Sequence, residues 1–253
     1  MINRWIWTSD EVKNAPSIRA GMSQKEETRL RREGCKIVVE VGSTLRLKAN
    51  PTMATASTYF HRFYMYHTFS DFPRELTALG CLFLAGKVEE TPKKCRDICN
   101  SAVQRFPDIF NSYASLTDEV MGIERVLLQT LKFDLQVDLP YEALLEYGKI
   151  FPGVSKEQMS ETIQIAWTFI NDSYYTTLCI TVEAQLIAIA LLHLAFTVKE
   201  VKLGAVENTW WEQDVSNWSN EAVDRTCHMV LDFYTATKEN PIFAEPAAVV
   251  PNK

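Results

Sequence analysis

The sequence predicts an all-α protein in which a short N-terminal helix precedes two five-helix units. Three observations support this fold class. Glycine accounts for only 9 of the 253 residues, which disfavours a fold rich in strands and tight turns. Apolar residues recur three and four positions apart in most segments, as they do on one face of an α-helix. Segments of the first half also reappear about 110 residues later, which indicates a repeated structural unit.

The N-terminal helix is predicted from its first residues. Thr8 and Glu11 have the spacing of a capping box, and Pro16 marks the end of the helix that they begin. Trp5 and Trp7 stand just outside this helix. We expect them to pack it onto the larger body of the protein.

Capping residues and prolines bound the helices of the first unit. Ser23 and Glu26 form a second capping box, and an apolar stripe follows them through Ile37 and Val41. Prolines in turns around 51, 73 and 92 separate the later helices. The helices of this unit are expected at 23–47, 53–67, 73–90, 92–104 and 118–131, with a loop over 106–115 and with Thr117 or Asp118 as the last cap.

Internal similarity predicts the second unit. A shift of 110 residues places the sequence LFLA at 82–85 on LHLA at 192–195, and Val88 on Val198. The helix at 118–131 has a counterpart at 220–236, which Ser219 caps. Two units are too few for an open solenoid, so we expect them to pack together. The predicted organisation is an N-terminal segment and helix at 1–22, a first unit at 23–137, a second unit at 138–239 and a flexible tail at 240–253.

Composition excludes several functional classes. The net charge of −6 disfavours direct binding of nucleic acid, which needs a basic surface. The six cysteines are scattered, so we expect reduced thiols and a cytosolic or nuclear protein. The first residues lack a secretory signal, and the longest apolar run, at 186–198, is too short to span a membrane. We therefore expect that run to be a buried core helix.

No motif for catalysis or cofactor binding stands out. Gly86-Lys87 lacks the rest of a phosphate-binding loop, because Cys81 and Val88 occupy the positions of its other required residues. Cys95 and Cys99 are one helical turn apart, but no second ligand pair has zinc spacing. We expect no catalytic residue, no metal and no cofactor, and we interpret the chain as a binding or regulatory module. A helical hydrolase or transferase is the alternative, which activity of the chain alone would reveal.

The segment at 82–94, LFLAGKVEETPKK, is the candidate for a partner site. Leu84 and Val88 are four residues apart and share a helix face, while Lys87 and two glutamates crowd the same end of the helix. An apolar ridge edged by charge is typical of a partner-binding surface. A core helix that ends in charged residues has the same pattern.

Several stretches resemble the cyclin box, and they resemble the transcriptional branch of the cyclin family in particular. They include LFLAGKVEETPKK at 82–94, HRFYMYHTF at 61–69 and LLQTLKFDLQV at 127–137. AWTFINDS at 166–173, TWWEQ at 209–213 and CHMVLDFY at 227–234 extend the resemblance into the second unit. Cyclins consist of two five-helix boxes after an N-terminal helix, which agrees with the organisation predicted above.

The resemblance implies a non-catalytic activating subunit of a cyclin-dependent kinase. Kinases of this branch phosphorylate the C-terminal domain of RNA polymerase II in the nucleus, so a role in transcription elongation is expected. The partner would be the kinase, in a heterodimer, with neither nucleic acid nor membrane bound directly. The resemblance places the kinase-binding surface on Leu84, Lys87, Val88, Glu90, Glu124, Leu128, Phe133 and Leu135.

Two alternatives stay open. Lys87 and Glu124 can pair with each other inside the fold instead of, or as well as, contacting a kinase. A cyclin-fold general transcription factor that binds nucleic acid is the alternative function, although the net charge of −6 speaks against it.

The sequence also departs from the cell-cycle branch. That branch has an aspartate where this chain has His61, so a buried pair between Arg31 and an aspartate is unavailable and another anchor is expected. The surface that corresponds to the substrate-docking patch of that branch is expected to include Glu33 and Gly34. We therefore predict no binding of short Arg-x-Leu peptides, and a micromolar Kd from calorimetry would overturn this prediction.

Overall fold

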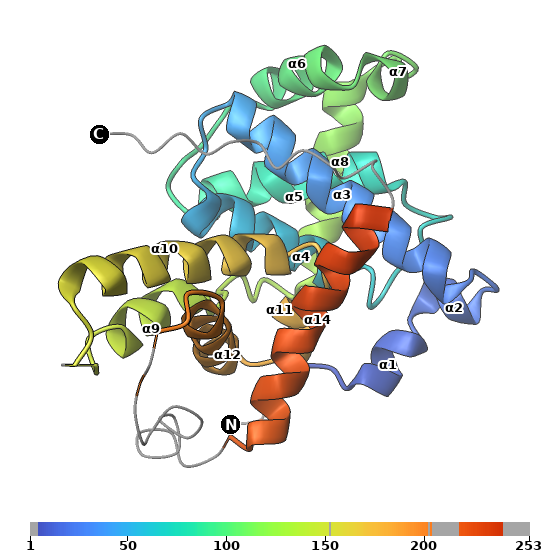
Figure 1. Ribbon diagram of the computed structural model, residues 1–253. Coiled ribbons are helices and arrows are strands. Elements are labelled where there is room, and N and C mark those ends of the chain that lie inside the picture. Colours follow the sequence, from blue (N-terminus) through green and yellow to red (C-terminus); the bar gives the residue numbers. More distant parts are fainter. Residues whose placement is uncertain (1–4, 152, 202, 204–217, 240–253) are drawn as a thin grey trace.

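A computed structural model describes residues 5–151, 153–201, 203 and 218–239. The described part of the chain is helical and contains no strand, which confirms the predicted all-α class (Figure 1). Among the same residues, no helix combines the length and the apolar character needed to cross a bilayer. The tail predicted at 240–253 lies outside the described residues.

The helices of the first half follow the predicted order. They are α1 (Ser9–Lys13), α2 (Pro16–Arg19), α3 (Gln24–Thr44), η1 (Ala49–Met53), α4 (Ala54–Phe63), α5 (Arg74–Val88), α6 (Cys95–Arg105), α7 (Pro107–Phe110) and α8 (Leu116–Thr130). The second half contains α9 (Pro140–Tyr147), α10 (Lys156–Ser173), α11 (Leu178–Thr181), α12 (Ala184–Val198) and α14 (Asn220–Glu239). The predicted loop at 106–115 therefore contains the short helix α7, and Ser115 precedes α8 where Thr117 or Asp118 was expected.

The predicted helix starts are confirmed to different degrees. At α1 the capping box is complete, because the Glu11 amide donates to Thr8 Oγ1 at 3.2 Å and the Thr8 amide donates to Glu11 Oε2 at 2.7 Å. At α3 only half of the box forms. Ser23 Oγ accepts from the Glu26 amide, but the Glu26 carboxylate accepts hydrogen bonds from Arg29.

Two hydrophobic clusters form around α5 and α12. Helix α5 packs against α3, α4 and α8, and its residues from Leu76 to Gly86 are buried. Helix α12 packs against α9, α10 and α14 and is buried along most of its length. A helix surrounded by others is apolar on most sides, which explains why 186–198 is apolar along most of its length and interrupted by His193. The predicted core helix is thus confirmed, whereas the domain boundary at 137–138 stays a prediction.

The 110-residue repeat corresponds to a repeated backbone motif at the ends of these two helices. The Thr91 amide donates to the Gly86 carbonyl at 2.8 Å, and the Val201 amide donates to the Phe196 carbonyl at 3.0 Å. Between them, Glu90 and Glu200 adopt left-handed backbone, with φ of 54° and 53°. This six-to-one bond around a left-handed residue is a Schellman ending, made here without glycine. Equivalent positions in the two halves therefore terminate in the same way.

A buried histidine anchors α4 between the two halves. Arg31 is only 1% exposed, pairs with Glu27 at 2.5 Å and donates to the His61 carbonyl at 3.0 Å. The imidazole accepts from Arg31 through Nδ1 at 3.3 Å and donates from Nε2 to the Tyr174 carbonyl at 2.9 Å. Since arginine only donates and a carbonyl only accepts, the ring is the neutral Nε2–H tautomer. This network replaces the absent arginine–aspartate pair.

Candidate functional site

The C-terminal half of α5 and the middle of α8 cross at close range. A Cβ atom added to Gly80 would lie 2.5 Å from Cγ2 of Ile123, so only glycine fits at this crossing. Lys87 follows Gly80 by seven residues, which returns it to the same face of α5. Glu124 follows Ile123 directly on α8. The crossing therefore brings these two charged side chains to the same edge of the helix pair.

Lys87 and Glu124 pair with each other. Lys87 Nζ donates to Glu124 Oε1 at 2.7 Å, and the side chains are 46% and 13% exposed. The ammonium group also lies 4.0 Å from the centre of the Phe83 ring, a cation–π contact. The alternative in which the two residues pair with each other inside the fold is confirmed. Lysine has three donors and a carboxylate has two acceptor oxygens, so both groups keep capacity for a further partner.

The turn after α5 is fixed by side chains of α4 and η1. Thr55 Oγ1 donates to Glu89 Oε1 at 2.7 Å, and the Thr52 and Thr91 hydroxyls lie 2.9 Å apart. Glu90 points outward and is exposed. This bracing holds the left-handed residue Glu90 in place, next to the end of the apolar face that carries Val88.

The turn after α8 exposes a phenylalanine. Lys132 and Phe133 both have left-handed backbone, with φ of 53° and 57°, and the Phe133 side chain is 70% exposed. Positive φ is rare for a bulky side chain and indicates that surrounding contacts impose it. Here Trp5 Nε1 donates to Asp134 Oδ2 at 2.8 Å, and the Tyr59 hydroxyl donates to the Leu135 carbonyl at 2.5 Å.

The predicted site residues fall into three groups. Lys87, Glu90 and Phe133 are exposed, whereas Val88, Glu124, Leu128 and Leu135 are half-buried. Leu84 is 3% exposed and belongs to the core, so it supports the surface from below. These residues line the ends and the crossing of α5 and α8.

Sequence reasoning missed two residues of this surface. Phe83 lies beneath the Lys87 ammonium, and its position four residues earlier on the helix was the available signal. Met121 is 38% exposed and precedes Glu124 by one helical turn, so it continues the apolar face of α8. An apolar residue at that spacing from Glu124 was visible in the sequence.

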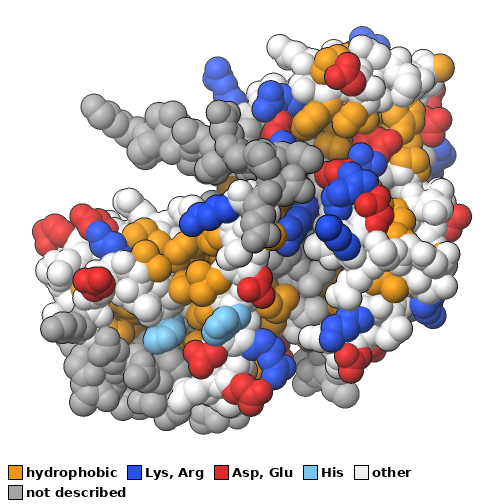
Figure 2. All heavy atoms as spheres, turned by 45° about the vertical axis from the view of Figure 1, so that its right-hand side comes forward, with side chains coloured by type: hydrophobic (Ala, Val, Ile, Leu, Met, Phe, Trp, Pro, Cys, Tyr) orange, Lys and Arg blue, Asp and Glu red, His pale blue; other side chains and the backbone are white. Residues whose placement is uncertain are grey.

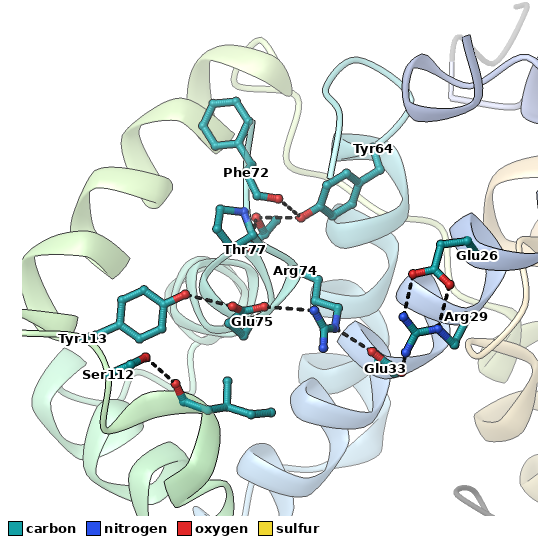
Figure 3. Close-up of polar contacts among 12 residues, drawn as sticks. Glu26, Arg29, Glu33, Tyr64, Phe72, Arg74, Glu75, Thr77, Ser112 and Tyr113 are labelled. Carbon is teal, nitrogen blue, oxygen red and sulfur yellow. Dashed lines mark hydrogen bonds and ion pairs between the residues drawn. The ribbon is translucent and has the colours of Figure 1, made fainter. Parts of the chain in front are cut away.

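A charged network covers the outer surface of α3 and α5 (Figure 3). Glu33 accepts from Arg29 at 2.5 Å and forms an ion pair with Arg74, whose Nε lies 2.7 Å from Glu33 Oε2, and Glu75 accepts from the Tyr113 hydroxyl at 2.8 Å. Glu33 therefore lies on this surface as expected. Gly34 does not, because it is buried and a Cβ there would lie 2.0 Å from the Phe60 ring. The prediction about Arg-x-Leu peptides stays a prediction.

The thiols carry no sign of reactive chemistry. Burial raises the pKa of every cysteine, Cys95 and Cys99 included, so the thiols stay protonated near neutral pH. In the described part of the chain, no three metal-ligating side chains come together.

Comparisons with known proteins agree with this architecture. Residues 4–136 match the family model described as the N-terminal domain of cyclins. The chain belongs to the cyclin family. Members of this family are non-catalytic regulatory subunits of protein kinases.

The branch expected from the sequence motifs, that of cyclin K and cyclin T, is also supported. This cyclin is 43% identical to human cyclin-K over 242 residues, which are 93% of the chain and 41% of that protein. It is 43% identical to zebrafish (Danio rerio) cyclin-K over 251 residues, 96% of the chain and 58% of that protein. The expected likeness to cyclin K is thus confirmed, although the chain spans only about half the length of these relatives.

A solved structure shows the same fold. A chain in the crystal structure of the yeast RNA polymerase II C-terminal-domain kinase complex CTDK-1 superposes with a TM-score of 0.74. The two share 18% identity, with 98% of this cyclin and 79% of that chain covered.

Proposed function

We propose that this cyclin binds and activates a cyclin-dependent kinase that phosphorylates the C-terminal domain of RNA polymerase II, and that it supports transcription elongation in the nucleus. Its 43% identity to cyclin-K and its likeness to a chain of the CTDK-1 complex support the proposal. The kinase-binding surface would consist of the exposed and half-buried residues at the ends and the crossing of α5 and α8.

One observation carries this proposal: the Lys87–Glu124 pair lies beside an apolar surface that ends in the exposed Phe133. A partner helix that packs on Val88 and Leu128 would bury their apolar area. Lys87 would donate to an acidic or carbonyl group at one end of that helix, and Glu124 would accept from a donor. Charges at the edge of an apolar surface fix the direction of a bound helix.

Activation would follow from a shift in population. An active protein kinase needs its β3 lysine paired with a glutamate of its αC helix. A cyclin that binds only the inward position of that helix stabilises the active state by its differential affinity. To convert a kinase that is 1% active into one that is 99% active, that difference must reach about 5.5 kcal/mol.

Reconstitution tests the proposal. The purified chain is titrated into recombinant cyclin-dependent kinases, and phosphorylation of a polymerase C-terminal-domain peptide is measured. We expect no activity from the chain alone and saturable activation of at least one kinase. If no such kinase binds, the proposal is wrong. A salt-dependent shift of DNA by the chain would instead favour the alternative, a nucleic-acid-binding transcription factor.

The nuclear role has a separate test. The tagged chain in cells should lie in the nucleus, and its rapid depletion should lower nascent transcripts more at the ends of genes than at their starts. A uniform loss along genes would contradict a role in elongation.

A further inference from the structure

A cleft of about 330 Å³ lies between the two halves of this cyclin, apart from the α5–α8 surface. Its walls come from α1, α2, the first half of α3, the turn at 175–177 and the second half of α14. Figure 2 faces the side that carries α1, α2 and α14, and Lys and Arg side chains lie near the middle of that view. The volume is at the low end for ligand pockets, so the cleft fits one or two side chains and excludes a large cofactor.

Arg32 supplies this cleft with a positive charge that forms no ion pair with any described residue. Its Nε atom is buried and has no hydrogen-bond partner among the described residues. The guanidinium carbon lies 5.2 Å from the centre of the Phe233 ring, and burial lowers the pKa of Arg32. The neighbouring Arg31 differs, because Glu27 neutralises it at 2.5 Å. A buried donor without a partner costs free energy, which a carboxylate bound beside Arg32 would recover.

Two aromatic rings form one wall of the cleft next to this charge, with Tyr175 half-buried and Phe233 6% exposed. Tyr175 and Phe233 stack with their centres 5.4 Å apart and their planes at 2°. Tyr175 follows α10 and Phe233 lies on α14, and both line the cleft together with Met229. An apolar side chain placed on this wall would leave water and lie within reach of Arg32.

A third feature selects the kind of anion. Asp232 lines the cleft, is exposed, and forms no ion pair with Arg32 in the described structure. Its charge disfavours the dense negative charge of a phosphate group more than the single charge of a carboxylate. Beside the paired Glu27 and Arg31, the cleft therefore combines the arginine of Arg32, one aromatic wall and the repelling carboxylate of Asp232.

We propose that this cleft binds an acidic linear peptide of a partner protein. A carboxylate of the peptide pairs with Arg32, and a neighbouring aromatic or long aliphatic side chain packs on Tyr175 and Phe233. The cleft shares no residue with the α5–α8 surface, so such a peptide and a kinase use different residues of this cyclin. The proposal therefore does not depend on which kinase is bound.

Fluorescence anisotropy on the full chain tests this proposal. The probe is a fluorescein-labelled peptide in which glutamate alternates with phenylalanine and leucine. We expect saturable binding, which Arg32→Gln weakens at least about tenfold because a charge-assisted hydrogen bond is lost. Asp232→Asn should strengthen binding several-fold, and this exposed position carries little risk for folding. The matched control is Arg29→Gln, which removes the same charge from the same helix outside the cleft and should leave binding unchanged.

Three outcomes would overturn the proposal. Equal weakening by Arg32→Gln and Arg29→Gln would show that the peptide responds only to overall charge. Equal binding of a probe with glutamine in place of glutamate would show that the cleft does not recognise a carboxylate. Unchanged or weaker binding by Asp232→Asn would exclude the rim of this cleft as the site, even if Arg32→Gln unfolds the protein.

Discussion

Lys87 Nζ lies 2.7 Å from Glu124 Oε1, and this contact joins the end of α5 to the middle of α8. The pair is partly open to water, so its own contribution to folding is small, up to about 1 kcal/mol. Both side chains also belong to the proposed kinase-binding surface. Their importance for folding and their importance for binding can therefore be separated by mutation.

Reversal or removal of either charge should weaken kinase binding while the cyclin stays folded. We expect Lys87→Glu and Glu124→Ala to lower the affinity by about 2–5 kcal/mol, because each leaves a desolvated partner group unpaired in the complex. The free energy of unfolding should change by no more than about 1 kcal/mol. Calorimetry with the kinase and thermal denaturation of the free cyclin give the two values.

The charge swap Lys87→Glu with Glu124→Lys is the decisive control. It restores the ion pair within the cyclin but reverses the polarity that a kinase helix meets. We expect folding like that of the parent and binding as weak as that of the single variants. Recovery of binding in the double variant would mean that the kinase needs only the intact pair and contacts neither charge.

The packing of α5 on α8 should depend on Gly80. Replacement by alanine forces a Cβ to within 2.5 Å of Ile123, so we expect Gly80→Ala to destabilise the fold by about 1–3 kcal/mol. Gly122 on α8 is the matched control, because nothing lies within 4 Å of an added Cβ there. Gly122→Ala should stabilise the fold by about 0.5–1 kcal/mol through helix propensity. Chemical denaturation measures the change in the free energy of unfolding for each variant. Equal changes for Gly80→Ala and Gly122→Ala would contradict the close crossing of α5 and α8.

Helix positions were predictable from the sequence because they depend on local signals. The capping residue Thr8, the helical stripe and the 110-residue repeat each follow from spacing alone. Helix α7 has four residues, which is too short for an apolar period to show. The misplacement of Gly34 was avoidable, since it follows Leu30 and precedes Val38 by four residues on the buried stripe.

The exposure of Phe133 was not predictable from local sequence. It depends on left-handed backbone at Lys132 and Phe133, where neither glycine nor asparagine signals such a turn. The turn is closed locally by the Phe133 amide, which donates to the Leu128 carbonyl at 3.1 Å. Trp5 and Tyr59, which are distant in the chain, hold the next two residues. The turn that exposes Phe133 therefore combines a local bond with tertiary contacts.

Phe133 should contribute to partner binding and little to folding. Glycine adopts positive φ without strain, so Phe133→Gly should keep or raise the free energy of unfolding, by up to about 1 kcal/mol. The same change should weaken kinase binding by about 2 kcal/mol, because an exposed aromatic anchor is lost. Lys132→Gly relieves the same backbone strain next to it and should leave binding unchanged. Equal binding of the parent and Phe133→Gly in calorimetry would remove Phe133 from the surface.

The buried histidine should make this cyclin sensitive to acid. Burial, together with the nearby Arg31 charge, lowers the pKa of His61 to about 3. Between pH 6.5 and 3 the unfolded chain therefore binds a proton at His61 that the folded protein does not. The contribution of His61 to the free energy of unfolding is then fully present above pH 6.5. It is lost as the pH falls below that value, by up to about 1.4 kcal/mol per pH unit.

The variant His61→Gln isolates this contribution. Glutamine can accept from Arg31 and donate to the Tyr174 carbonyl, but it does not titrate. We expect similar stability of the parent and variant near pH 7.5, and a shallower loss for the variant between pH 6.5 and 4.5 in urea titrations. Other acidic groups also titrate in this range, yet they are common to both proteins and cancel in the difference. Parallel pH profiles would show that His61 becomes protonated without loss of the fold, and the neutral tautomer assigned from its partners would then be wrong.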